Sequence, residues 1–249
     1  PLSLRSRVFS RCKGLMSFDF TYCDKISDST FGDCYSLTSI ILPNSLDITS
    51  AINAFSGCEN LKTAKLPDNI DTIPSGFFSG CTNLEIVETG KIKTVNPSAF
   101  ENCKNLKTIE LPEKLTEIMS LVFYGCESLE SIVIPENVTK IGMSAFDGCG
   151  ALSSVTIPKG VTTISSYAFY NCNSLETVYF GGTEEEWNAI SVGGDNDPLL
   201  NAEIVFNYCP HEKCEWTVLE DGTKEKVCKK CGEVLETLGA DERIPNDIN

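Results

Sequence analysis

The sequence predicts an α/β repeat solenoid, a curved parallel sheet with short helical or irregular return segments, followed by a small C-terminal β ribbon. Two observations predict the solenoid: a cysteine recurs at nearly constant spacing, and apolar residues keep fixed places between the cysteines. The recurring residues are Cys12, Cys34, Cys58, Cys81, Cys103, Cys126, Cys149 and Cys172, separated by 22, 24, 23, 22, 23, 23 and 23 positions. A unit this short cannot bury its own apolar face, so neighbouring units must stack. The ribbon is predicted by four later cysteines that leave this spacing.

The clean repeat from Cys126 to Cys149 has the form Cys-x-x-Leu-x-x-Ile-x-Ile-Pro-x-x-Val-x-x-Ile-x-x-x-Ala-Phe-x-x-Cys. Its Ile-x-Ile segment alternates as a half-buried strand does. Proline follows at once, where a strand can end without losing a ladder hydrogen bond. The tail Ile-x-x-x-Ala-Phe predicts a short helical turn that places Phe146 in the core.

Three earlier repeats depart from this form. The unit from Cys81 is one residue shorter and has Thr89 and Gly90 in place of the Leu-Pro pair. The unit from Cys34 gains one residue, and the unit from Cys12 is the most degraded, with Cys23 in the place that Val138 fills later. We therefore expect one continuous solenoid over residues 1–180 with local irregularities.

The two halves of the repeat, Cys-x-x-Leu-x-x-Ile-x-Leu-Pro and Ile-x-x-x-Ala-Phe-x-x-Cys, resemble the leucine-rich repeats of the bacterial BspA-like type. The resemblance covers about residues 8–180. It implies a leucine-rich-repeat solenoid that acts as a binding platform, as in bacterial surface adhesins that engage host extracellular-matrix proteins or other cells. Since repeats are platforms, the resemblance is specific for the fold and much less so for the ligand.

The eight repeat cysteines are predicted to form a buried column of free thiols. The alternatives are redox chemistry or disulfide bonds. Side chains that point the same way in a parallel ladder cannot easily face each other to form a disulfide. Free cysteine behaves as a small hydrophobic residue and is among the most buried types.

The ligand-binding face is predicted on the strand positions that lie between two core aliphatic residues. After Asp19 this row contains Ile41, Lys65, Glu88, Glu110, Val133, Thr156 and Tyr179. A second row, two positions earlier, is rich in hydroxyl groups: Ser17, Ser39, Thr63, Ile86, Thr108, Ser131, Ser154 and Thr177. Three interpretations stay open, namely a solvated sheet face, a small-ligand site and a broad protein-binding face of the kind solenoids commonly use.

Residues 181–207 are predicted to cap the solenoid, because an open end would expose apolar core. Thr183 and the three glutamates after it predict a helix start with carboxylates in its first turn, where the helix dipole favours them. Trp187 and Ile190 would cover the last repeat, and residues 202–206 would add a final strand. A sugar-binding role for Trp187 is the alternative.

Residues 208–237 are predicted to form a cysteine-rich ribbon, and residues 238–249 a polar tail. Asp221 and Gly222 between strand-like runs predict a hairpin, and Cys-x-x-Cys-Gly is a usual half of a tetrahedral zinc site. Four of five candidates would bind a structural zinc ion: Cys209, His211, Cys214, Cys228 and Cys231. Two disulfides are the alternative for a mini-domain of this size.

The ribbon also resembles the small Cys-x-His…Cys-x-x-Cys-Gly-Glu modules appended to Gram-positive surface repeat proteins. This resemblance favours Cys209, His211, Cys228 and Cys231 as ligands and leaves Cys214 extra. No cofactor other than zinc is expected.

Composition excludes several function classes. With 20 basic and 35 acidic residues the net charge is −15, which argues against a nucleic-acid or anionic-membrane surface. No apolar run approaches the ~20 residues needed to cross a bilayer. One histidine, and no phosphate loop, nucleophile elbow or carboxylate pair, argue against an enzyme.

The first functional hypothesis is therefore a secreted or cell-surface protein that binds a protein ligand through the solenoid face. The second is an intracellular zinc-ribbon scaffold that organises protein partners, and the third is a structural spacer. The sequence starts inside a repeat and shows no signal peptide, so we expect a fragment or a processed form.

Overall fold

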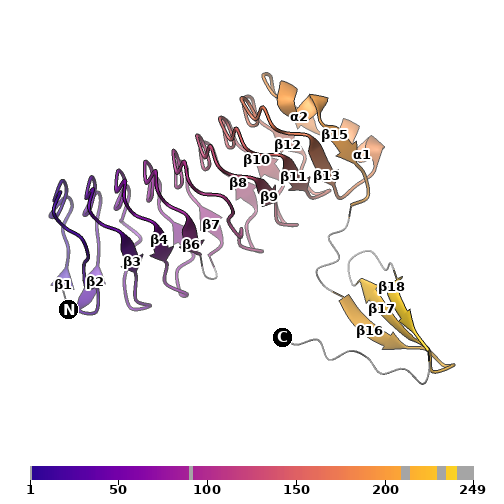
Figure 1. The fold of residues 1–249 in the computed structure, drawn as a ribbon, viewed down its shortest axis with the longest axis horizontal. Helices are drawn as coiled ribbons and strands as arrows, with labels where there is room; N and C mark the ends of the chain where they lie inside the picture. Colours follow the sequence, from indigo (N-terminus) through magenta and orange to yellow (C-terminus); the bar gives the residue numbers. More distant parts are fainter. Residues whose placement is uncertain (1, 90–91, 209–213, 229–233, 240–249) are drawn as a thin grey trace. The chain divides into compact units, whose positions relative to one another are not determined.

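The computed structural model describes residues 2–89, 92–208, 214–228 and 234–239. The chain divides into two compact units, Pro1–Phe206 and Asn207–Asn249. In the first unit, successive coils of the chain lie side by side as a parallel β-solenoid with little helix (Figure 1). The predicted repeat architecture is therefore confirmed.

Two rows of short strands run along this unit. The front sheet contains β3 (Ser39–Ile41), β4 (Thr63–Lys65), β6 (Ile86–Glu88), β9 (Ser131–Val133), β11 (Ser154–Ile157), β13 (Thr177–Phe180) and β15 (Glu203–Val205). The back row contains β1 (Leu2–Ser3), β2 (Cys23–Lys25), β5 (Thr72–Ile73), β7 (Thr94–Val95), β8 (Glu117–Ile118), β10 (Lys140–Ile141), β12 (Thr163–Ile164) and β14 (Ser191–Val192). All pairs in both rows are parallel, and each strand pairs with its counterpart in a neighbouring coil. The back row therefore continues the same stacking on the other side of the core.

A column of phenylalanine rings fills the core. The rings of Phe100, Phe123, Phe146 and Phe169 are fully buried and stack at centroid distances of 5.6, 5.5 and 5.1 Å. The stack continues towards the N-terminus through Phe78, Phe55, Phe31 and Phe9. Each repeat thus contributes one ring, as the Ala-Phe motif predicts.

The return segment that carries this phenylalanine is not helical, contrary to the helical turn expected from Ile-x-x-x-Ala-Phe. It is a run of tight turns, because two residues per repeat have a left-handed backbone, for example Ser144 (φ 51°) and Gly148 (φ 77°) around Phe146. A helix would direct its amides along its own axis. Here alternate amides reach the next coil instead, as when Phe146 N donates to Ala168 O at 2.8 Å.

Both sheet rows are interrupted near the short repeat. Residues 108–110 form no strand, and no strand pairing within the described residues joins β6 to β9 or β7 to β8. Thr89 occupies the core position that leucine or isoleucine fills elsewhere, and its hydroxyl donates to Glu110 O at 3.4 Å. The amide–carbonyl hydrogen bonds that join the return turns of neighbouring coils, here called the turn ladder, still cross this place. For example, Phe100 N donates to Val122 O at 3.0 Å. The interruption is thus confined to the strand rows.

After the last repeat, the helix predicted to start at Thr183 is present as α1 (Glu184–Asn188). Thr183 and Glu186 form a capping box, and Trp187 packs edge-on against Phe180 at 5.2 Å. The helix α2 (Asp197–Asn201) and the buried Asn196 before it were not predicted from the sequence.

Asn196 closes the turn ladder at the end of the solenoid. Its Oδ1 accepts from Phe169 N at 3.0 Å, in place of the carbonyl that a further repeat would supply. Its Nδ2 donates to Ser165 O and Gly193 O at 3.0 and 2.9 Å.

The second unit contains an antiparallel sheet. Its strands β16 (Cys214–Val218), β17 (Lys224–Cys228) and β18 (Val234–Leu238) follow in order. Asp221 and Gly222 lie in the turn between β16 and β17, as the hairpin signal predicts. Neither β18 nor a strand reaching Leu238 was predicted from the sequence.

Gly142 provides a test of coil spacing. A Cβ at this position would lie 2.6 Å from Ser120 N and 2.7 Å from Met119 C, which are backbone atoms. We expect Gly142→Ala to lower the free energy of unfolding by about 2–3 kcal/mol, measured by urea denaturation. Gly150→Ala is the control, because nothing lies within 4 Å of a Cβ there. Equal losses for the two variants would contradict this account.

Candidate functional site

The front sheet displays side chains from alternate positions of each strand. In β3, Ile40 is buried, whereas Ile41 is 71% exposed. The strand register aligns Ile41 with Lys65 and Lys65 with Glu88. In the second part of the sheet it aligns Val133, Thr156 and Tyr179. Six of the seven predicted face residues therefore lie in two ladders, each on a rigid hydrogen-bonded scaffold.

Glu110 does not join either ladder. It is exposed, but residues 108–110 form no strand. The hydroxyl-rich row behaves in the same way: Ser39, Thr63 and Ile86 align in one block, and Ser131, Ser154 and Thr177 align in the other. The predicted face is thus two separate blocks.

Charges on the first block are already paired. Lys65 Nζ lies 2.9 Å from Glu88 Oε2, and both side chains are more than half exposed. Exposed pairs of this kind contribute little to stability. Neighbouring coils thus present opposite charges side by side.

Apolar side chains interrupt these charges. Ile41, Ile86 and Val133 are 71%, 57% and 49% exposed. They lie on different strands and are separated by polar side chains in the register, so they form no single large apolar patch. This mixture suits a broad protein contact more than an enclosed small-ligand site.

The thiol column lies behind this face. Seven cysteines, from Cys34 to Cys172, are buried, whereas Cys12 is partly exposed. Each buried thiol donates to the backbone carbonyl of a phenylalanine in the preceding repeat. For example, Cys126 Sγ lies 3.2 Å from Phe100 O, and Cys149 Sγ lies 3.2 Å from Phe123 O. The sequence predicts thiols stacked on thiols, and this polar link between coils was not predicted.

Burial controls the chemistry of these thiols. Desolvation is the main cause that raises the pKa of Cys34 to about 11 and that of Cys58 and Cys172 to about 12. Because the thiolate is the reactive form, the column is poorly suited to redox or nucleophilic chemistry.

We expect the seven buried thiols to resist iodoacetamide in the native protein while Cys12 is modified readily. Peptide mapping by mass spectrometry after a timed reaction measures each site, and the urea-unfolded chain gives the full labelling rate. Modification of Cys126 as fast as Cys12 under native conditions would show that the column opens.

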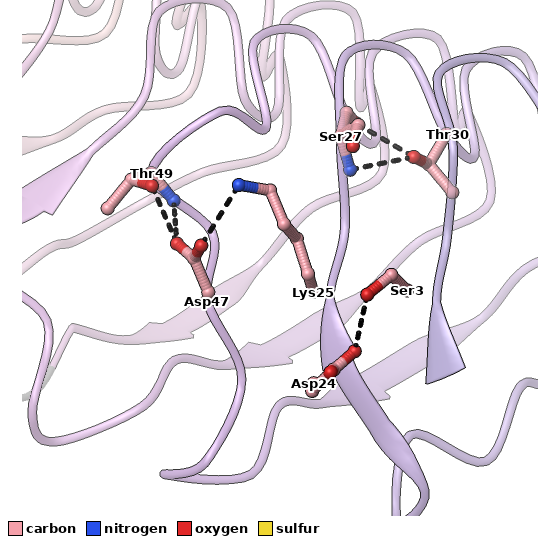
Figure 2. A network of polar contacts seen from close by, with 7 residues as sticks. All are labelled: Ser3, Asp24, Lys25, Ser27, Thr30, Asp47 and Thr49. Carbon is pink, nitrogen blue, oxygen red and sulfur yellow. Dashed lines mark hydrogen bonds and ion pairs between the residues drawn. The ribbon is translucent and has the colours of Figure 1, made fainter. Parts of the chain in front are cut away.

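The back row carries a polar network over the first coils (Figure 2). Lys25 Nζ lies 3.1 Å from Asp47 Oδ2, and the other oxygen of Asp47 accepts from the amide and hydroxyl of Thr49. These hydrogen bonds from Thr49, and then the charge of Lys25, lower the pKa of Asp47. An open hollow of about 490 Å³ lies beside this network and extends to Asp71.

This hollow is a poor candidate for a cation site. Asp47 is held by Lys25 and Thr49, and Lys93 Nζ lies 2.8 Å from Asp71 Oδ1. Its carboxylates therefore already interact with cations and donors of the chain itself.

The predicted zinc ligands lie mostly outside the described residues. Cys209, His211 and Cys231 are not described, and only the backbone of Cys214 is, where it pairs in register with Cys228. Within the described ranges, no three His, Cys, Asp or Glu side chains are grouped as a metal site would need. The choice between zinc and disulfides stays a prediction. Native mass spectrometry would decide it by the mass of a bound metal.

None of the helices among the described residues is long and apolar enough to span a membrane.

Comparison with known proteins supports the repeat assignment. The family model described as "BspA type Leucine rich repeat region (6 copies)" matches residues 2–118 and 85–190. No curated protein matches the chain.

Three solved structures are similar to this chain. The T. pallidum leucine-rich repeat protein TpLRR is 29% identical, with a TM-score of 0.55, over 66% of this chain and 75% of its own. A Bacteroides ovatus leucine-rich repeat protein is 24% identical, with a TM-score of 0.47, over 82% of this chain and 66% of its own. A leucine-rich cell surface protein of Faecalibacterium prausnitzii is 20% identical, with a TM-score of 0.33, over 68% and 79%. The last two scores are too low to support any inference about this chain.

The family match covers more than half of the sequence and coincides with the solenoid. Solenoids of this kind typically serve as binding scaffolds, so the match indicates a protein-binding role. The chain therefore belongs to the BspA-type leucine-rich repeat family.

Proposed function

We propose that this protein is a secreted or cell-surface bacterial binding protein whose front sheet mediates adhesion to a protein of the host matrix or of another cell. The observation that carries the proposal is the ordered display of exposed side chains on two rigid blocks of parallel strands, β3–β4–β6 and β9–β11–β13–β15. Each block fixes its side chains before binding, which reduces the entropy lost on association. Family membership supports the protein-binding part of the proposal.

The location is tested by protease shaving of intact source cells. If the proposal is right, peptides of this chain are released while the cells stay sealed. Peptides seen only after lysis would overturn it and would favour the intracellular scaffold.

The binding face is tested with a fourfold variant, Lys65→Ala, Glu88→Ala, Glu110→Ala and Tyr179→Ala. The matched control removes the same charges and one tyrosine elsewhere: Lys140→Ala, Glu117→Ala, Asp71→Ala and Tyr22→Ala. In this control Lys140 and Glu117 form an ion pair of 3.1 Å on the back row.

Matrix proteins and whole cells immobilised on a surface serve as probes. We expect the face variant to lose about tenfold or more in affinity. Truncation of an interface residue that contributes to binding weakens the free energy of binding by about 1–2 kcal/mol or more. The control should bind as the unmodified chain does. Equal binding by the two variants would exclude the front sheet as the binding face, and thermal unfolding checks that both are folded.

A further inference from the structure

A second exposed surface lies on the return turns near the C-terminal end of the solenoid, away from the front-sheet positions. It consists of Leu121, Tyr124, Met143, Tyr167 and Tyr170, here called the tyrosine ridge. Met143, Tyr167 and Tyr170 are 53%, 41% and 42% exposed, and Leu121 and Tyr124 are partly exposed. Nothing in the repeat pattern requires large side chains there.

The backbone shows that two of these side chains are costly to place. Leu121 and Tyr167 have φ angles of 60° and 61°, in the left-handed region. Five other repeats have a small or amide side chain or glycine at this position, namely Ser29, Asn53, Gly76, Ser98 and Ser144, and the first coil has Arg7 there. A bulky residue in this region is a genuine outlier, and such outliers cluster at functional sites.

The ridge is held rigid by the turn ladder. Tyr167 N donates to Gly194 O at 2.9 Å, and Gly148 N donates to Tyr170 O at 2.9 Å. The two rings meet edge to face at a centroid distance of 5.5 Å. The Tyr167 hydroxyl also hydrogen-bonds to Asp195, which raises the pKa of this phenol. Tyrosines fixed in this way supply contact area at low entropic cost and are enriched in binding hot spots.

The charge around the ridge has one sign. The four turn segments that form it and its edge, 119–125, 142–148, 165–171 and 193–196, contain no Lys or Arg and two aspartates, Asp147 and Asp195. Asp147 occupies the same place in its coil as Tyr124 and Tyr170 do in the coils on either side. By contrast, the corresponding turn of the first coil carries Arg5, Arg7 and Arg11. The tyrosines are thus confined to the C-terminal coils, whereas the equivalent turns of earlier coils also carry acidic residues, Asp28, Asp33 and Glu101.

We propose that the tyrosine ridge is a docking surface for a Lys- or Arg-bearing segment of a partner protein, separate from the front sheet. A cation over a tyrosine ring is attracted by the ring's negative face, and a neighbouring carboxylate adds a charge-assisted hydrogen bond. Rings and carboxylates alternate across consecutive coils, so they would bind successive basic residues of an extended segment.

The test uses the full chain and a short fluorescent peptide in which Arg and Lys alternate with Gly and Leu. A matched peptide has Gln in place of each basic residue. Binding is followed by fluorescence anisotropy at physiological ionic strength. We expect the basic peptide to bind and the Gln peptide not to bind.

Tyr167→Ser with Tyr170→Ser should weaken the basic peptide about fivefold or more, the effect of losing one to two cation–π contacts. Tyr22→Ser is the control. Tyr22 is 78% exposed and lies in the first repeat region, and the substitution leaves the net charge unchanged. Unchanged affinity in the double variant, or an equal loss in Tyr22→Ser, would overturn the proposal and leave only attraction to the net charge.

Two further measurements test the occupant of the ridge and its independence from the front sheet. If sedimentation shows a dimer that the same double variant abolishes, the ridge binds a second copy, and the proposal of a separate partner is overturned. If the fourfold front-sheet variant still binds the basic peptide while matrix binding is lost, the two surfaces are independent, as proposed. Loss of matrix binding therefore neither supports nor overturns the proposal for the tyrosine ridge.

Discussion

Raising the pH above about 9 will unfold the solenoid over a narrow range, because the unfolded chain releases thiol protons that the folded chain keeps. Burial raises the pKa of Cys34 to about 11 and that of Cys58 and Cys172 to about 12. It raises the pKa of Cys81, Cys103, Cys126 and Cys149 still further. An unfolded thiol titrates near about 8.5. The folded state therefore keeps its full stability below the unfolded pKa, and it loses stability as the pH rises towards the pKa values of the folded thiols.

The size of the effect follows from proton linkage. Each buried thiol lowers the free energy of unfolding by up to about 1.4 kcal/mol per pH unit above its unfolded pKa. A domain is typically stable by only about 5–15 kcal/mol, so a column of seven exhausts this within one to two pH units. Urea denaturation followed by circular dichroism, at several pH values with reductant and constant ionic strength, measures the slope.

A single-thiol variant separates this cause from the titration of lysines and tyrosines. Cys126→Ala should reduce the slope of stability against pH by about 1.4 kcal/mol per unit, whatever it does to stability at neutral pH. Cys126→Ser, which keeps a small side chain at the same place without a thiol, should reduce the slope by the same amount. If Cys126→Ala has the same slope as the unmodified chain, the thiols do not govern alkaline stability.

Phe123→Ala will lower the free energy of unfolding by about 3–5 kcal/mol. The Phe123 ring is fully buried and stacks between Phe100 and Phe146 at 5.6 and 5.5 Å. Its removal opens a cavity that both neighbouring coils line. The backbone of these coils is held by the turn ladder and cannot collapse into the space, so the cost should fall in the upper part of this range. The midpoint of urea denaturation measures the loss.

Phe123→Leu is the matched control, because it keeps an apolar side chain of similar volume and should cost less than about 1.5 kcal/mol. A loss below 1 kcal/mol for Phe123→Ala would contradict the close packing of the column.

Much of the solenoid could be predicted because its core residues recur at a constant spacing along the sequence. The cysteine spacing and the Ala-Phe pair mark the same core positions in every coil, and both Cys126 and Phe123 are fully buried. The turn geometry could not be predicted, since Ser144 and Tyr167 share a left-handed backbone that neither residue type favours. That conformation is imposed by hydrogen bonds to the next coil, which a single repeat does not show.

The candidate face was only partly predictable. The alternation of each strand correctly placed Lys65 and Val133 on the exposed side, but the row was taken as unbroken. The missing residue after Cys81 and the polar Thr89 were visible in the sequence, yet their consequence depends on pairing between coils. The same holds for Asn196, whose role requires that Phe169 lacks the acceptor a further coil would provide.

The interruption of both strand rows near residues 108–110 has a mechanical consequence. A continuous sheet resists bending, because every coil is tied to the next on both sides of the core. Here the coils stay joined through the turn ladder and the aromatic stack while the strand ties are absent. The described strand pairing is thus divided into blocks, β3–β4–β6 and β9–β11–β13–β15 in one row and β1–β2, β5–β7 and β8–β10–β12–β14 in the other. We expect the coils around residues 108–110, where both rows are divided, to bend more readily than coils within a block.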